Sequence, residues 1–163
     1  MAIPVYLWLE DDNGTSVKGS VDIAGREGSI EVLEHMHSVE LPVDPRTGKI
    51  TGKRLHSGFA FMKEIDSSTP YLYRSLSTGR MLKKATFRFY RINDNGMEEE
   101  YFRVTLENAR VLEVEPLLLD VKNDKWAKHN HLEYIDMGYE KITWHYLDGN
   151  IIHTDTWKER SAI

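Results

Sequence analysis

Cysteine is absent from this chain of 163 residues, which excludes both disulfide bonds and thiolate-bound zinc as sources of stability. No apolar run approaches the roughly 20 residues needed to cross a bilayer, so we expect no membrane insertion. Acidic residues outnumber basic ones, and the formal net charge is -5. Because phosphate binding requires a clustered basic face, this balance argues against a nucleic-acid partner. Residues 1–10 lack a basic leader and a small-residue cleavage site, and they are predicted to form a strand rather than a signal peptide.

Compact motifs of common enzymes are also missing. The sequence has no Gly-x-Ser-x-Gly segment of a nucleophile elbow, and its glycines lack the spacing of a phosphate-binding loop. His35-Met36-His37 and His129-Asn130-His131 each place two imidazoles on one face of a strand, within reach of one ion. A zinc site would need a third ligand, for which the candidates are His145, His153, Asp136 and Asp155. Nothing in the sequence brings these residues together, so we expect no metal, no cofactor and no catalytic residue.

Turn sequences recur at short intervals, which is typical of an all-β protein. Asp11-Asp12-Asn13-Gly14, Asn93-Asp94-Asn95-Gly96 and Asp148-Gly149-Asn150 each separate two apolar segments, and glycine supplies the positive φ of a tight hairpin. After Tyr101–Leu106 the apolar pattern changes face, since Ala109 and Val111 alternate out of phase with the residues before them. Such a strand is buried on both faces or bends between two sheets at a bulge. No linker or repeat appears, so residues 1–163 are predicted to form one domain.

A single helix is predicted at about 66–79, inside this otherwise β-rich pattern. Ser67, Ser68 and Thr69 can each cap its start, and a proline at position 70 suits the first turn. Leu72 and Leu76 lie four residues apart on one face, and a glycine at position 79 suits the end. The segment Pro116–Lys128 allows two readings, a strand followed by a loop or a short irregular helix.

One long connection, at about 43–58, carries prolines, glycines, cations and one large apolar side chain at its tip. Connections of this length are uncommon in a compact domain and are usually functional or mobile. Its candidate contact residues are Arg46, Lys49, Ile50, Lys53 and Arg54.

Five segments of the chain resemble, in order, the Hcp (haemolysin-coregulated protein) family of type VI secretion tube proteins. They are Arg26–Val32, Thr47–His56, Phe61–Pro70, Glu100–Asn108 and Tyr139–Trp144. The run Lys63-Glu64-Ile65-Asp66-Ser67-Ser68-Thr69-Pro70 is the most specific of these similarities. The resemblance implies a two-sheet antiparallel β-barrel with one flanking helix and the extended loop already noted.

The same resemblance implies a structural protein rather than an enzyme. Members form hexameric rings that stack into the inner tube of an injection apparatus, so the expected partners are other copies of the chain, a tip spike protein, sheath proteins and effectors in the lumen. The protein would be made in the bacterial cytoplasm and then secreted through the type VI machine without a signal peptide. The loop at 43–58 would make ring-to-ring contacts, and Met36 would face the lumen and its cargo.

Two functions of other classes are left open by the residues themselves. One is a small β-barrel hydrolase with a histidine and carboxylate site, with or without zinc. The other is a monomeric β-sandwich that binds a sugar or a peptide.

Overall fold

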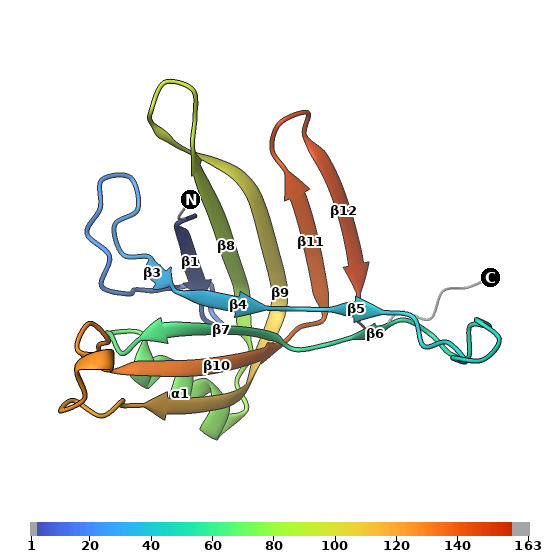
Figure 1. Ribbon diagram of the computed structural model, residues 1–163, viewed down its shortest axis with the longest axis horizontal. Coiled ribbons are helices and arrows are strands. Elements are labelled where there is room, and N and C mark those ends of the chain that lie inside the picture. Colours follow the sequence, from blue (N-terminus) through green and yellow to red (C-terminus); the bar gives the residue numbers. More distant parts are fainter. Residues whose placement is uncertain (1–2, 158–163) are drawn as a thin grey trace.

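The computed structural model describes residues 3–157, and within that range the chain is antiparallel β-structure with one α-helix (Figure 1). The helix is α1 (Thr69–Thr78), and a 3-10 turn, η1, covers Asp124–Trp126. The strands are β1 (Val5–Glu10), β2 (Ser16–Val17), β3 (Ile30–Val32), β4 (Glu34–Met36), β5 (Val39–Glu40), β6 (Leu55–His56), β7 (Phe59–Glu64), β8 (Leu82–Ile92), β9 (Glu98–Leu117), β10 (Leu132–Gly138), β11 (Lys141–Tyr146) and β12 (Ile151–Thr156). None of the helices in the described range is long and apolar enough to cross a membrane.

Two antiparallel sheets share strands and enclose the core. Sheet A contains β2, β3, β1, β8, the first half of β9, β11 and β12, while sheet B contains the second half of β9, β10, β7 and β4. The segment from β3 to β4 passes between them, because β3 pairs with β1 in sheet A and β4 pairs with β7 in sheet B. Leu33 lies at the crossing and donates its N–H to the Met62 carbonyl at 2.8 Å. The mainly β, two-sheet architecture with one helix is therefore confirmed.

Strand β9 is the second connection between the sheets, and it confirms the predicted bend. Residues 98–109 pair with β8, and residues 110–117 pair with β10. The register with β10 shifts after Asp136, which leaves Leu112 as the extra residue of a bulge. Ala109 and Val111 are buried, whereas Leu112 is half-exposed on the outer side.

The core fills the space between the sheets with side chains from both. Phe59 and Phe61 of β7 contact Phe87 of β8, with ring centroids 4.4 and 5.3 Å apart. The other fully buried large side chains are Leu7, Leu9, Ile30, Leu72, Leu106, Ile135, Met137, Ile142 and Lys63.

Helix α1 follows β7 and covers one flank of the barrel, within the predicted range. Its first turn contains Pro70, and it ends at Gly79, whose φ of 70° is left-handed. Leu72 is fully buried, but Leu76 is 37% exposed, so the predicted apolar face is narrower than expected. The segment 116–128 contains parts of both alternatives, since β9 ends at Leu117, a loop follows, and the short 3-10 turn η1 covers Asp124–Trp126.

A buried ion pair joins β7, β10 and α1. Lys63 and Glu133 lie opposite each other in the register, and both side chains are fully buried. The Lys63 ammonium also contacts Asp66 at 3.0 Å, and the Thr69 hydroxyl donates to Glu133 at 2.8 Å. The cluster fixes the turn between β7 and α1 to strand β10, because Lys63, Asp66 and Thr69 come from the turn and its two ends and Glu133 comes from β10.

The predicted loop is a two-stranded arm. Strands β5 and β6 pair at its base, and an isolated bridge joins Val43 to Ile50 near its tip. Residues 39–56, called the arm below, extend away from the barrel at the right of Figure 1. The prediction of an extended segment is confirmed, although its last part, residues 55–56, is strand β6.

We expect the substitution Glu133→Gln to lower the free energy of unfolding by about 3–5 kcal/mol, because it leaves a buried ammonium without its opposite carboxylate. Equilibrium unfolding in guanidinium chloride at one fixed protein concentration measures this loss. Glu107→Gln is the control, since the Lys141–Glu107 pair is exposed on both sides and contributes at most about 1 kcal/mol. Equal losses in the two variants would show that the buried pair has no special role.

Candidate functional site

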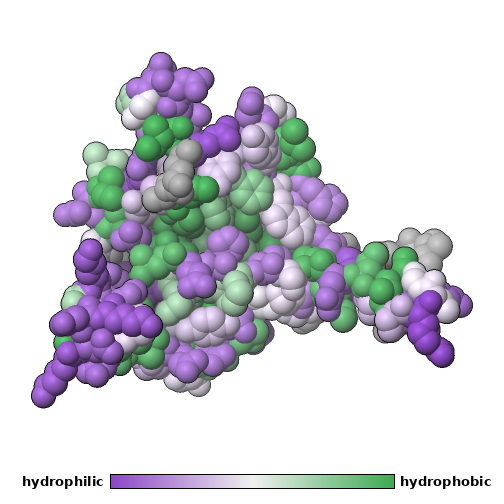
Figure 2. Space-filling model, in the orientation of Figure 1, coloured by the Kyte–Doolittle hydropathy of each residue, from purple (hydrophilic) through white to green (hydrophobic). Residues whose placement is uncertain are grey.

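The arm exposes apolar side chains over most of its length. Figure 2 shows hydrophobic residues along the arm and hydrophilic ones at its end. Each of the following is between 39% and 58% exposed: Val39, Leu41, Val43, Ile50 and Leu55. The arm is too thin for the rest of the chain to cover these five apolar side chains. Exposed apolar side chains grouped in this way are typical of a contact surface.

The structure separates the predicted contact residues into two groups. Arg46, Lys49, Ile50 and Lys53 are exposed on the outer part of the arm. Arg54 lies at the base, where its guanidinium binds the Asp155 carboxylate through two hydrogen bonds of 2.6 and 2.7 Å. Arg54 therefore holds the arm to β12, a role that the sequence reasoning did not predict.

A chain of hydrogen bonds continues from this ion pair into the barrel. Asp155 contacts Nε2 of His56 at 2.8 Å, and Nδ1 of His56 lies 2.6 Å from the Tyr139 hydroxyl. The same hydroxyl lies 2.7 Å from Nε2 of His37. These contacts tie together the arm base, the end of β4, the β10–β11 turn and β12.

The ion pair fixes the direction of the first hydrogen bond in this series, the one between Asp155 and His56. The Arg54 hydrogen bonds lower the pKa of Asp155 to about 2, so its carboxylate accepts and Nε2 of His56 must donate. The Tyr139 hydroxyl bridges Nδ1 of His56 and Nε2 of His37, at 2.6 and 2.7 Å. Burial lowers the pKa of His37 to about 4, with smaller contributions from His56 and His35, so His37 is neutral at pH 7.

His56 and Asp155 have the geometry of a histidine–carboxylate pair, which the hydrolase alternative requires. The second nitrogen of His56 is occupied by Tyr139 rather than open to a substrate. Burial raises the pKa of Tyr139, so its hydroxyl is a poor nucleophile. The arrangement favours a structural clamp over catalysis.

The two histidine pairs do not build a metal centre in the described residues. His35 and His37 share a face as predicted, and both rings contact Phe59 with ring centroids 5.2 Å away, His35 stacked and His37 tilted by 33°. His129 contacts the Trp126 ring instead. No three histidine or carboxylate side chains within residues 3–157 are placed to hold one ion.

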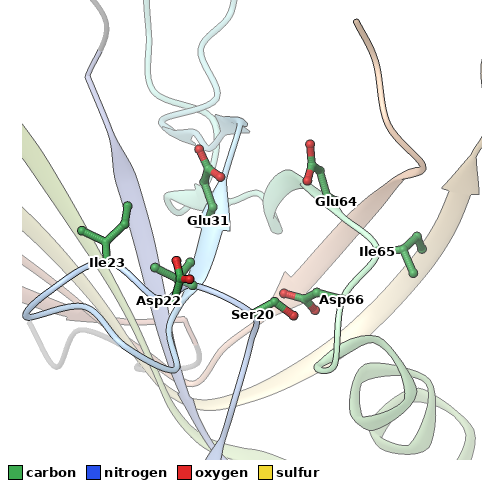
Figure 3. A pocket seen from close by; sticks show the side chains of 8 residues that line it. Ser20, Asp22, Ile23, Glu31, Glu64, Ile65 and Asp66 are labelled. Atoms are coloured by element: carbon green, nitrogen blue, oxygen red, sulfur yellow. The ribbon is translucent and has the colours of Figure 1, made fainter.

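An acidic groove lies at the end of the molecule opposite the arm. Its volume is about 230 Å³, and its walls come from the β2–β3 loop, β3 and the end of β7. Figure 3 shows carboxylates from three segments around it, and Asp66 lies beside Ser20. The lining carboxylates are Asp22, Glu31, Glu64 and Asp66. Sequence reasoning missed this groove because its residues are far apart along the chain.

Met36, the predicted lumen residue, is 65% exposed on the outer face of sheet B. It lies opposite Ala60, which in turn lies opposite Asp136, so the three residues form one row across the sheet. A cavity opens beside this row. Asp136 entered the sequence reasoning only as a possible zinc ligand.

Stability should decrease as the pH falls from about 6.5 toward 4, because His37 binds a proton in the unfolded chain before it does so in the folded one. The substitution His37→Gln removes this group and should reduce the slope over that interval. The free energy of unfolding, followed against pH at constant protein concentration, measures the difference. Burial lowers the pKa of His35 as well, so a smaller slope remains in the variant. An unchanged slope would contradict the assignment.

Comparisons of the sequence and of the structure with known proteins both lead to one family. A family model described as type VI secretion system effector, Hcp, matches residues 6–146. The chain is 30% identical to the "Major exported protein" of Pseudomonas aeruginosa over 138 residues, which covers 85% of this chain and 80% of that protein.

Solved structures agree with this match. A double mutant of the Hcp1 protein from the E. coli EAEC 042 pathovar is 55% identical and superposes with a TM-score of 0.87, covering 96% of this chain and 99% of that one. Secreted protein Hcp3 from Pseudomonas aeruginosa is 22% identical and shares the fold, with a TM-score of 0.77 over 97% of this chain and 100% of that one. The chain therefore belongs to the Hcp family of type VI secretion proteins.

Proposed function

We propose that this chain is a structural subunit of a type VI secretion inner tube. Six copies form a ring, rings stack into a tube, and the protein is exported with effectors held in the lumen. It is made in the bacterial cytoplasm and reaches the exterior through the same machine. Within that machine, a tip spike protein and sheath proteins are its further partners. Membership of the Hcp family supports the class of function, and the exposed arm supports self-assembly.

The arm is the observation that carries this proposal. It combines exposed apolar side chains with exposed cations, while the clamp formed by Arg54, His56 and Asp155 fixes its base. Because the arm is rigid at its base, it loses little conformational entropy when another copy covers its apolar side chains. The contact would be heterologous, because arm and acidic groove lie at opposite ends of the longest axis.

Charge supports the pairing of arm and groove between stacked rings. Arg46, Lys49 and Lys53 lie on the outer arm, and the groove of the next copy offers Glu31 and Glu64. Ile50 supplies the apolar anchor, whose burial contributes about 2 kcal/mol for each contact. Arg54, already bound within its own chain, belongs to the arm base in this proposal rather than to the ring contact.

We expect Ile50→Asp to weaken ring stacking while rings of six 19.0 kDa chains persist. The side chain is 58% exposed in the free subunit, so folding should be unaffected. Sedimentation velocity separates single chains, rings and stacks, and negative-stain electron microscopy shows the rings directly. Thr51→Asp is the matched control, since it adds the same charge to the neighbouring exposed position without removing an apolar side chain. Unchanged stacking in the Ile50 variant would remove the arm from the ring contact, and a purely monomeric wild type would overturn the proposed function.

Reversing charge on one side of the contact should weaken stacking, and reversing both sides should restore it. The arm variant is Lys49→Glu with Lys53→Glu, and the groove variant is Glu31→Lys with Glu64→Lys. Each exposed pair contributes about 0.5 kcal/mol, so either double variant should stack several-fold less well at low salt. A mixture of the two variants should recover mixed stacks in sedimentation. Failure of the mixture to recover them would show that the arm contacts a different surface.

A further inference from the structure

The acidic groove has one wall that the core holds in place and one wall that is a surface loop. On the first side, Asp66 accepts a hydrogen bond from the buried Lys63 ammonium at 3.0 Å. The second wall is formed by residues 20–23, which belong to the loop between β2 and β3, residues 18–29. Figure 3 shows Ile23 of this loop and Ile65 at the end of β7 on opposite sides of the groove. The width of the groove therefore depends on where the loop is held.

Backbone hydrogen bonds give this loop its shape. The N–H of Val21 donates to the Ser29 carbonyl at 3.2 Å, and the N–H of Gly28 donates to the Val21 carbonyl at 2.9 Å. The N–H of Arg26 donates to the Ile23 carbonyl at 2.9 Å. Among the described residues, every backbone-to-backbone hydrogen bond of residues 21–27 joins two parts of the loop itself. These bonds shape the loop but do not attach its outer part to the barrel.

The side chain of Arg26 makes that attachment. Its guanidinium carbon lies 3.9 Å from the ring centroid of Tyr90 and 4.9 Å from that of Tyr6. Its Nη1 atom forms an ion pair of 2.7 Å with Glu98, and only 11% of the arginine side chain is exposed. The three partners belong to β8, β1 and β9. A planar guanidinium can cover aromatic rings and pair with a carboxylate at the same time, which an ammonium cannot do equally well.

We propose that Arg26 is a positioning residue of the acidic groove, which holds the β2–β3 loop at the distance from β7 at which the groove accepts the cationic arm of another copy. The assignment rests on the proposed function, which makes the arm the occupant of the groove. Arg26 does not line the groove and acts through the loop residues that do, among them Asp22. A wall that is already in place loses little conformational entropy when the arm arrives, whereas a released loop must be ordered at that moment.

The test measures the distance between the two walls. The natural chain contains no cysteine, so Ile23→Cys and Ile65→Cys introduce two specific sites for nitroxide labels, one on each wall. Continuous-wave electron paramagnetic resonance reports their separation as dipolar broadening. Singly labelled chains give the reference spectra, and dilution with unlabelled chain removes broadening between neighbouring copies. In this doubly labelled background, Arg26→Gln should reduce the broadening, because the released loop moves away from β7.

Three further variants separate positioning from a general loss of stability. Arg91→Gln is the matched control, since the guanidinium of Arg91 also lies over a ring, that of Tyr101 at 5.0 Å, but outside the loop. It should leave the broadening unchanged. Tyr90→Phe keeps the aromatic face and should also leave it unchanged, whereas Arg26→Lys keeps the charge but covers the rings less well and should give an intermediate spectrum. A role confined to folding stability would lower the melting temperature without this order among the spectra.

Sedimentation of the unlabelled variants connects the width of the groove to assembly. Arg26→Gln should stack about three- to tenfold less well than the natural chain, since the loop must then be ordered on contact. Arg91→Gln should stack normally. Rings should persist in both variants, because the substitution acts on the contact between rings.

Unchanged broadening in Arg26→Gln would overturn the inference, and so would an equal loss in Arg91→Gln. Weaker stacking without any change in broadening would also overturn it, because Arg26 would then act on the partner directly. Reduced broadening with normal stacking would support Arg26 as the residue that holds the loop and would count against the arm as the occupant of the groove, which belongs to the proposed function. The spectra can be recorded on single chains as well, so a failure to form rings would count against the proposed function alone.

Discussion

The ion pair of Lys63 and Glu133 is the constraint on which much of this barrel depends. Both residues point inward from adjacent strands, and both side chains are fully shielded from solvent. Because side chains alternate along a strand, this pair fixes which residues of β7 and β10 point outward. A slip of one residue would place two charges in water and bury Met62 and Tyr134 instead. The ion pair on the inner face of sheet B thus determines which side chains lie on the outer face, including the row from Met36 to Asp136.

Local chemistry was enough to predict the turns, the helix and the bend in β9. Glycine in a short loop and serine or threonine before proline act over a few residues, so the sequence reports them directly. Family resemblance added the two-sheet barrel and the likeness to tube proteins, and family and fold are confirmed. The stacking and lumen roles of individual residues stay predictions.

Contacts between distant residues could not be predicted in the same way. His37 and Tyr139 are 102 positions apart, and Arg54 and Asp155 are 101 apart. One signal was present for the buried pair, since Lys63 interrupts the apolar face that Phe59 and Phe61 begin. No comparable signal marked Asp136, because a single acid in a strand is usually solvated. Arg54 seemed equivalent to Lys53 in sequence, and only the fold distinguishes the clamp from the exposed arm.

Strand β9 gives the subunit a mechanical property. A single run of 20 residues belongs to both sheets, so covalent bonds as well as hydrogen bonds connect them. Pulling the sheets apart would require the backbone itself to straighten at the bulge beside Leu112, and the peptide chain resists stretching far more strongly than a ladder of hydrogen bonds does. The two sheets of one subunit therefore cannot separate along β9 unless that strand unbends.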